Sequence, residues 1–376
     1  MKWEKVKLGN VTDSCLGKML DQNKNKGDYQ PYLANVNVRW GEFDLEDLPL
    51  MKFEESEQER YELKYGDLVI CEGGEPGRCA IWKEQIPNMK IQKALHRVRV
   101  HDCLDYRYLF YWFLLAGKTG ELDQYFTGAT IKHMPGQKLK EVVIDKPPLE
   151  IQHRIADILS AYDDLIENNQ KQIKLLEEAA QRLYKEWFVD LHFPGHENTK
   201  IVDGVPEGWR RGLLKELISV NYGKDHKKVP DDGNIPVYGS GGLMRKCNKS
   251  LFSGEAVLIP RKGSLNNIMY VDETFWTVDT MFYATMKQPH TAVFVYFFVK
   301  AFDMYSMNIG AAVPSMTTKI LDAMDVVIPD KETLEKFDKY AKVYFNKIKT
   351  LQGQNEQLKT ARDLLLPKLM SGEVEV

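Results

Sequence analysis

The fold of this chain is decided by one stretch, Lys146-Pro147-Pro148-Leu149-Glu150-Ile151-Gln152-His153-Arg154-Ile155-Ala156, where an extended segment becomes a helix. The paired prolines end the extended segment, because proline donates no ladder hydrogen bond and biases the preceding residue toward extended backbone. After them, apolar residues recur at three- and four-residue steps with charged residues between, which predicts a long amphipathic helix over residues 149–190. Its apolar stripe comprises Ile151, Ile155, Ile158, Tyr162, Leu165, Asn169, Ile173, Leu176, Ala180, Leu183 and Trp187.

A second stripe of this kind lies in residues 330–376 and comprises Leu334, Phe337, Ala341, Tyr344, Ile348, Leu351, Asn355, Leu358, Ala361 and Leu365. A long helix cannot bury such a stripe alone, so we expect the two helices to pack together as an antiparallel coiled coil. Each stripe has one asparagine near its middle, and antiparallel packing predicts that Asn169 lies near Asn355 in a polar layer that fixes the register. The alternative is that they are ordinary solvated residues. The step pattern of the first stripe also predicts a stutter at Asn169.

Outside the helices, the chain repeats itself. Trp3 and Trp209 each open a segment with a leucine five residues later, Leu8 and Leu214. Two further motifs recur in the same order: YGDLVI at 65–70 as SGEAVL at 253–258, and GATIKHM at 128–134 as GAAVPSM at 310–316. A period this long indicates two tandem domains and not a solenoid.

We therefore predict an α+β protein with two similar mixed α/β domains separated by the two long helices. The predicted boundaries are residues 1–148 for the first domain, 149–190 for the first helix, 191–329 for a linker and the second domain, and 330–376 for the second helix. Short β-rich runs with Gly, Pro and Asn between them indicate the mixed domains.

Composition excludes several classes of protein. The five cysteines are an odd number without zinc-ligand spacing, which argues against a disulfide framework or a metal site. The charged start of the chain and the short apolar runs predict neither a signal peptide nor a membrane span, so we expect a cytoplasmic protein. The net charge is −3, but residues 224–262 carry eight Lys and Arg against four Asp and Glu. Local charge matters more than the sum for contact with phosphates.

The stretches that resemble catalytic motifs all lack residues that the motifs require. Gly117-Lys118-Thr119 lacks the earlier glycine of a phosphate-binding loop, and the eight histidines show no metal-ligand spacing. Asp145-Lys146-Pro147-Pro148-Leu149 has a lysine where an adenine methyltransferase box has an acidic or amide residue, and a leucine where the box has an aromatic one. Glu62-Leu63-Lys64 lacks the rest of a nuclease signature. We therefore expect a binding protein with no catalytic residues, metal or cofactor of its own.

Basic side chains in turn-rich segments are the candidates for contact with nucleic acid, although any single one is otherwise an ordinary surface charge. The candidates are Arg78, Lys132, His133, Lys138, Lys224, Lys227, Lys228, Arg245, Lys246, Lys249, Arg261 and Lys262. Lys24, Lys26, Arg39, Lys140 and His226 are weaker candidates of the same kind. Base edges also require amides, which Asn23, Asn25, Asn35, Asn37, Asn221, Asn266 and Asn267 would supply.

The proline-to-helix element at residues 146–156 resembles the central conserved region of the specificity subunits of bacterial type I restriction-modification systems. The tryptophan openings resemble the same family. So does the second copy, Val326-Val327-Ile328-Pro329 leading to Leu364-Leu365-Leu366-Pro367-Lys368-Leu369-Met370-Ser371-Gly372. The resemblance covers essentially the whole chain. It departs from the family at residues 331–335, which lack the Pro-Pro and Gln-x-x-Ile of the first copy.

The resemblance implies two target recognition domains that each read half of a split double-stranded DNA sequence, with the helices setting the spacing. Two methyltransferase subunits would dock on the helices, and restriction subunits would join them; S-adenosylmethionine, ATP and Mg would be bound by those partners. The residues expected at the helix and subunit interface are Ile155, Tyr162, Asn169, Leu176, Leu183, Tyr344, Leu351, Asn355 and Leu358. The alternative is a coiled-coil adaptor with two protein-binding modules. The recognised bases and the spacer length do not follow from the sequence.

The expected polar layer leads to a first prediction. Asn169→Leu removes a polar group from an apolar seam, so the variant is expected to unfold at a higher temperature but to assemble less uniformly. Thermal unfolding and analytical ultracentrifugation measure the two effects. A loss of stability would contradict a shared polar layer.

Overall fold

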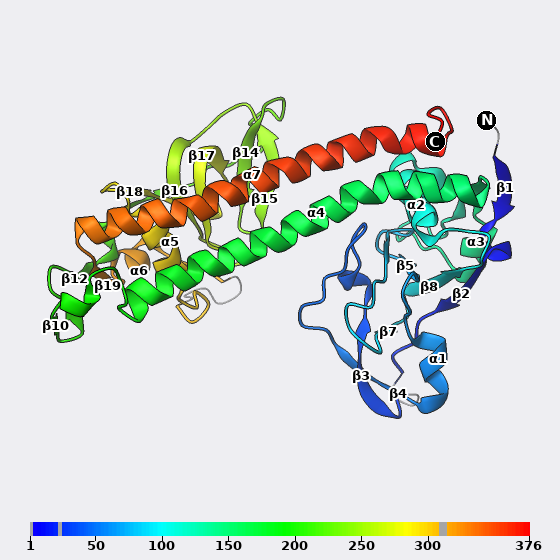
Figure 1. Cartoon of the computed structure of the whole chain (residues 1–376), viewed down its shortest axis with the longest axis horizontal. Coiled ribbons are helices and arrows are strands. Elements are labelled where there is room, and N and C mark those ends of the chain that lie inside the picture. The colour runs from blue at the N-terminus through cyan, green and yellow to red at the C-terminus, as the bar shows by residue number, and fades with distance from the viewer. Residues whose placement is uncertain (1–2, 22–24, 308–313) are drawn as a thin grey trace. The chain divides into compact units, whose positions relative to one another are not determined.

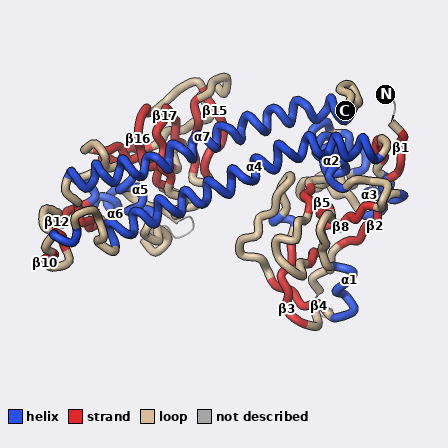
Figure 2. The backbone as a smooth tube through the Cα atoms, in the orientation of Figure 1, coloured by secondary structure: helices blue, strands red, loops and turns tan. Residues whose placement is uncertain are grey.

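The computed structural model describes residues 3–21, 25–307 and 314–376. Asn23 and Lys24, and the start of the second GAAVPSM motif at residues 310–313, lie outside the described residues. The chain forms two compact units, each labelled by element in Figure 1 and by element type in Figure 2. The first unit contains Met1–Asn168 and Gln354–Val376, and the second contains Asn169–Gly353.

Two long helices dominate the fold, as the stripes predict. α4 spans Leu149–Tyr184 and continues through a π-helical turn, Lys185–Val189, and α7 spans Lys331–Met370. In the first unit, the start of α4 packs with the end of α7, because Ile155 and Leu159 share a core with Leu366 and Leu369. The second unit joins the end of α4 to the start of α7 in its own core. The α+β fold with an antiparallel helix pair is confirmed.

Burial along α4 corrects the predicted stripe at two positions. Ile158 and Leu165 are 37% and 53% exposed, whereas the neighbouring Leu159 and Ile166 are 0% and 6% exposed. With these replacements, the steps from Ile155 to Trp187 alternate between four and three residues throughout, so the predicted stutter at Asn169 is wrong. Both members of each pair are apolar, and the wrong one therefore fitted the pattern equally well.

The stripe of α7 agrees with its prediction over its first half, since Leu334, Phe337, Ala341, Ile348 and Leu351 are all buried. At its end the predicted Leu365 is only partly buried, whereas Leu366 beside it is 1% exposed. The two central asparagines are also buried, at 8% for Asn169 and 6% for Asn355. The alternative that they are solvated surface residues is wrong. Their proximity to one another stays a prediction.

The first unit is built on two sheets and a short strand pair. The larger sheet is antiparallel with the order β2-β8-β5-β6, which are Thr12–Leu16, Leu95–Val100, Leu68–Cys71 and Cys79–Ile81. The smaller sheet has the order β4-β3-β7, which are Leu50–Phe53, Asp28–Leu33 and Lys90–Ile91, with β3 parallel to β7. β1 (Glu4–Lys7) pairs with β9 (Val143–Lys146) just before the prolines. The helices are α1 (Gln58–Tyr61), α2 (Tyr106–Thr119) and α3 (Gly136–Glu141).

The second unit has one six-stranded sheet. Its order is β13-β18-β16-β17-β14-β15, which are Ile218–Tyr222, Met281–Met286, Phe252–Pro260, Met269–Thr277, Ile235–Gly239 and Gly242–Cys247. β12 (Arg210–Leu213) pairs with β19 (Asp325–Ile328) immediately before α7. The remaining elements are the hairpin of β10 (Ile201–Val202) and β11 (Val205–Pro206), and the helices α5 (Ala292–Lys300) and α6 (Thr318–Asp322).

The two units repeat one topology. The order β2-β8-β5-β6 of the first unit matches β13-β18-β16-β17 of the second, and the pair β1-β9 matches β12-β19. The parallel pair β3-β7 matches β14-β17. The difference is that β17 is one nine-residue strand where the first unit has two separate strands, β6 and β7. The sequence repeat is therefore a structural repeat.

The tryptophans that open the two halves hold the two ends of α7. Trp3 Nε1 donates a hydrogen bond to the carbonyl of Met370 at 3.1 Å. Trp209 Nε1 donates to Asp330 Oδ2 at 3.0 Å, and Asp330 Oδ1 accepts from the backbone N–H of Thr333 at 2.9 Å, as a helix-capping residue does. The repeated tryptophans therefore fix where the second helix begins and ends.

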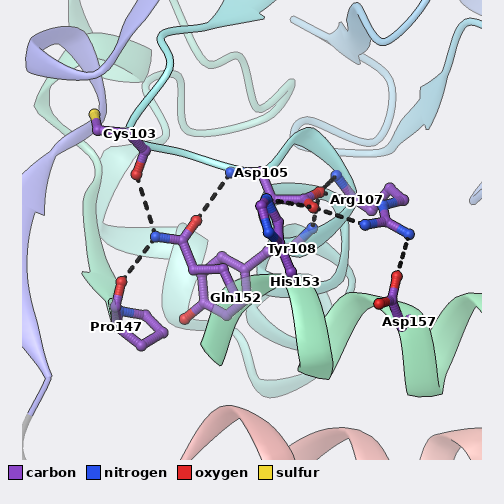
Figure 3. A network of polar contacts seen from close by, with 8 residues as sticks. All are labelled: Cys103, Asp105, Arg107, Tyr108, Pro147, Gln152, His153 and Asp157. Atoms are coloured by element: carbon purple, nitrogen blue, oxygen red, sulfur yellow. Dashed lines mark hydrogen bonds and ion pairs between the residues drawn. The ribbon is translucent and has the colours of Figure 1, made fainter. Parts of the chain in front are cut away.

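A buried polar network fixes α2 against the start of α4 in the first unit (Figure 3). The Gln152 side chain is fully buried; its Oε1 accepts from Asp105 N at 2.9 Å, and its Nε2 donates to the carbonyls of Cys103 at 3.2 Å and Pro147 at 2.8 Å. Asp105 caps α2, and its Oδ1 accepts from Arg107 N at 2.7 Å. One amide thus bonds three backbone groups, and two of these bonds, to the Asp105 N–H and the Pro147 carbonyl, are buried from solvent.

This network gives a second prediction. Gln152→Leu keeps the apolar part of the side chain but leaves the buried Asp105 N–H and Pro147 carbonyl unsatisfied, which is expected to lower the free energy of unfolding by about 1–3 kcal/mol. Calorimetry of the purified chain measures the loss.

The matched control is Asp157→Asn, which weakens an ion pair with Arg107 whose aspartate side chain is 65% exposed. Such a surface pair contributes at most about 1 kcal/mol. Equal losses in the two variants would mean that the buried amide has no special role.

Candidate nucleic-acid interface

Three loops of the first unit meet just beyond the end of β5 in its larger sheet. The loop after β5 contacts the segment before α3, because Gly73 forms a β-bridge with His133 and the N–H of Met134 donates to the carbonyl of Glu72 at 2.7 Å. The loop after β3 meets the same place through Asn35. Gly74 has a φ of +75°, and a Cβ on it would lie 2.7 Å from Asn35 Nδ2, so a glycine is required there.

The second unit repeats this junction bond for bond. Lys262 forms a β-bridge with Ser315, and the N–H of Met316 donates to the carbonyl of Arg261 at 2.9 Å. Gly263 has a φ of +85°, and a Cβ on it would lie 2.8 Å from Ser240 Oγ. We call this junction the three-loop edge: Asn35, Gly73–Arg78 and His133 in the first unit, and Ser240, Lys262–Asn267 and Ser315 in the second.

A side chain closes each three-loop edge in the same way. Arg78 Nη2 donates to the carbonyl of Asn35 at 3.1 Å in the first unit. Asn267 Nδ2 donates to the carbonyl of Ser240 at 2.9 Å in the second. Their neighbours differ in chemistry: Gly73, Glu75 and His133 of the first unit correspond to Lys262, Ser264 and Ser315 of the second. One backbone arrangement therefore presents two different sets of functional groups.

Glu75 is the most constrained exposed group at the first edge. Its Oε1 accepts a hydrogen bond from Trp40 Nε1 at 2.7 Å, and its Oε2 accepts from Arg78 Nη1 at 3.1 Å. The carboxylate side chain is still 54% exposed. It lies on the wall of a pocket of about 580 Å³, whose lining includes Trp40, Phe126 and Lys132.

The basic candidates of the first unit are mostly paired with acids. Arg78 pairs with Glu75 at 3.1 Å, Lys132 with Asp123 at 3.4 Å and Lys138 with Glu141 at 2.8 Å. His133 is exposed at the three-loop edge. The positive charge of this unit is therefore largely balanced where the candidates lie.

The basic candidates of the second unit divide into two groups. Arg245 has a framework role, because its Nη2 donates to the carbonyls of His226 at 2.6 Å and Val229 at 2.9 Å and so holds the loop after β13. Arg261 is partly buried, with its guanidinium 5.5 Å from the ring centre of Tyr222. The other candidates are exposed and form no ion pair within the described part of the chain; these are Lys224, Lys227, Lys228, Lys246, Lys249 and Lys262.

Comparison with known proteins agrees with this duplicated geometry. The family model for the type I restriction modification DNA specificity domain matches residues 1–178 and again 206–360. The chain belongs to this family. It is a specificity subunit of a type I restriction-modification system, and such subunits are the non-catalytic members of these systems.

Individual relatives cover most of the specificity subunit. The MjaIX specificity subunit of Methanocaldococcus jannaschii is 27% identical over 83% of this chain and 78% of its own length. The MjaVIII specificity subunit of the same organism is 24% identical over 100% of this chain and 93% of its own length. The crystal structure of the system S subunit from M. genitalium has the same fold, with a TM-score of 0.59 at 19% identity, and covers 98% of this chain and 96% of that one.

The predicted helix-interface residues of this specificity subunit are buried to different degrees. Ile155 and Leu351 are 0% and 2% exposed, and the two central asparagines are buried as described above. The remaining predicted residues are partly exposed; these are Tyr162, Leu176, Leu183, Tyr344 and Leu358. Partly exposed positions on a helix pair are compatible with contact to each other or to a further subunit, so their role stays a prediction.

Sequence reasoning missed Trp40 and Glu75 entirely. Glu75 is acidic, and a search for basic side chains passes over it. The only sequence signal was its place in a Gly-Gly-Glu-Pro-Gly loop directly after a strand. Among the described residues, no three His, Cys, Asp or Glu side chains are grouped so that they could hold a metal ion. None of the described helices combines the length and the apolar composition that a membrane span requires.

A buried histidine supports the first three-loop edge. His96 in β8 is 1% exposed, and its Nε2 lies 3.0 Å from the carbonyl oxygen of Met134, next to His133. Burial lowers the pKa of His96 below its ordinary value, because the charged imidazolium is poorly solvated there. The neutral ring is thus part of the framework under the edge.

This lowered pKa gives a third prediction. In the unfolded chain His96 takes up a proton as the pH falls below about 6.5, while in the folded chain it does so only at lower pH. Folding stability is therefore expected to decrease as the pH falls from about 7.5 to about 5.5. The part due to His96 is isolated by comparing thermal unfolding with His96→Gln, which retains an N–H donor but does not titrate. Identical pH profiles would contradict this role.

Proposed function

We propose that this specificity subunit recognises a bipartite double-stranded DNA sequence, with each unit reading one half and the two long helices setting the distance between the halves. The single observation that supports the proposal is the repeated three-loop edge. The same backbone hydrogen bonds recur in both units while the exposed side chains differ. Such a design serves a ligand with two similar but chemically distinct parts, which describes two different base sequences on one regular duplex.

The charges of the second unit fit phosphate contact. Its exposed lysines at 224, 227, 228, 246, 249 and 262 are not neutralised by acids of the described chain. Each phosphate that such a side chain neutralises releases bound counterions, which makes the affinity fall with salt. In the first unit, the balanced charge places more weight on hydrogen bonds to base edges.

The partners supply the chemistry in this proposal. Two methyltransferase subunits dock on the exposed positions of the helices and bind S-adenosylmethionine, and restriction subunits join through them with ATP and Mg. The specificity subunit contributes no catalytic residue and acts in the cytoplasm, where the DNA is. Discrimination and reaction then reside in different chains of one complex.

Selection from a randomised duplex library tests the proposal. The chain is co-expressed with its modification subunits, and the complex is used to recover bound DNA at increasing salt. A split motif with a fixed gap is the expected result, with binding that weakens by about one log unit per log unit of salt for each phosphate contacted. Binding without base preference, or no binding at all, would favour the protein-binding adaptor.

Charge reversal gives a fourth prediction. Replacing Lys227, Lys228, Lys246 and Lys249 by Glu is expected to weaken DNA binding of the complex by at least about a hundredfold. The slope of affinity against salt is expected to become shallower by about one unit for each phosphate that a lysine no longer neutralises. The motif itself remains, because phosphate contacts carry no base information.

The control variant reverses Lys200 and Lys215, which are also exposed lysines of the second unit but lie outside the basic segment. Thermal unfolding shows whether each variant is folded. An unchanged affinity in the four-lysine variant, or an equal loss in the control, would remove the basic segment from the DNA interface.

A further inference from the structure

The repeated three-loop edge allows the two units to be compared position by position. The residue after the positive-φ glycine is Glu75 in the first unit and Ser264 in the second, since Gly74 and Gly263 occupy the same place. A serine hydroxyl donates or accepts and therefore accommodates several bases, whereas a carboxylate accepts only. Glu75 therefore restricts the first three-loop edge to partners that donate a hydrogen bond, whereas Ser264 does not restrict the second in this way.

Glu75 is held in position by two donors. The Trp40 indole N–H binds Oε1 at 2.7 Å, and the Arg78 guanidinium binds Oε2 at 3.1 Å. Arg78 is itself fixed, because its Nη2 donates to the carbonyl of Asn35. Trp40 is fixed from behind by α2, where a Cβ on Gly117 would lie 2.7 Å from its ring. A side chain ordered before binding loses little entropy when it forms a further hydrogen bond.

The Glu75 carboxylate can accept further hydrogen bonds besides those from Trp40 and Arg78. Each oxygen accepts about two hydrogen bonds, so each retains acceptor capacity, and the side chain is 54% exposed. Arg78 and the nearby Lys132, which lines the same pocket, offset the negative charge that phosphates would otherwise repel. The arrangement suits an acceptor that must work close to a polyanion.

We propose that Glu75 is a base-reading residue of the first unit, which accepts a hydrogen bond from an exocyclic amino group in the major groove. The donors there are N4 of cytosine and N6 of adenine, whereas guanine and thymine present acceptors at the corresponding place. Trp40 is a positioning residue that acts through Glu75. This inference rests on the proposed function, because it assumes that the first unit reads DNA.

The first arm of the test uses Glu75→Gln in the complex with modification subunits. Glutamine has the same shape but also carries donors, so it tolerates base edges that present acceptors. Selection from the randomised duplex library is expected to show one position, within one half of the motif, where the preference changes about tenfold. A preference for cytosine falls, whereas a preference for adenine rises, because glutamine pairs with N6 and N7 of adenine together. The other half stays unchanged. Trp40→Phe is expected to weaken the preference at that same position to a smaller extent, since an aromatic ring remains and only the N–H donor is removed.

The second arm changes the DNA and leaves the protein intact. The base at the affected position is replaced by an analogue without its amino group, 2-pyrimidinone for cytosine or purine for adenine. The unmodified complex is expected to bind this duplex about tenfold more weakly. The analogue that has the effect identifies which of the two bases is read.

Three outcomes decide the matter. A changed preference at one position in the first arm, with weaker binding of the analogue at that same position in the second, supports the inference. An unchanged motif, or a uniform loss across both halves, in a Glu75→Gln variant with unchanged thermal unfolding would overturn it, as would analogues that bind normally to the unmodified complex. Absence of any split motif for the unmodified complex would overturn the proposed function first and this inference with it. The analogue arm does not depend on the folding of a variant.

Discussion

The burial of two apolar stripes is the constraint on which the rest of this structure depends. Neither unit has a complete core without segments from both long helices. In the core of the first unit, Ile155 and Leu159 of α4 pack with Leu366 and Leu369 of α7. In the core of the second unit, Tyr184 and Trp187 pack with Phe337 of α7. Segments far apart in the sequence must therefore meet before either core is closed. For this reason the boundary between the units falls inside the helices, after Asn168 and before Gln354.

Periodic and punctuating features of the sequence predicted most of this fold. The prolines at 147 and 148 end β9 where expected, and the long stripes predict both helices because each spacing is repeated many times. The errors at Ile158 and Leu165 arose where two apolar residues stand side by side. Only the three-dimensional partner decides which of such a pair is buried, and that information is not in the local pattern.

The contacts of the three-loop edge and of the buried polar network were less predictable, because each joins residues far apart in the sequence and occurs only once in its unit. Trp40 and Glu75 are 35 positions apart, and Gln152 meets Asp105 across 47. No periodic pattern in the sequence predicts such pairs. Charge was also an incomplete guide, since Arg245 directs its donors to backbone carbonyls of a neighbouring loop. An arginine, with its several donors, serves a loop as readily as a phosphate, and its type alone does not separate the two uses.

The two units differ most in how their sheets are joined. In the second unit, β17 runs unbroken from its pairing with β16 to its pairing with β14, so one strand belongs to both halves of the sheet. In the first unit, the chain leaves the ladder after β6 and returns as β7. The segment between them, residues 82–89, is held at its two ends, where Trp82 bonds to the backbone of Gly66 and Asp67 and the Met89 carbonyl accepts from Leu63 N. A change of length between those two ends is therefore expected to disturb the sheet less than the same change within β17, which would shift every partner beyond it to the opposite face.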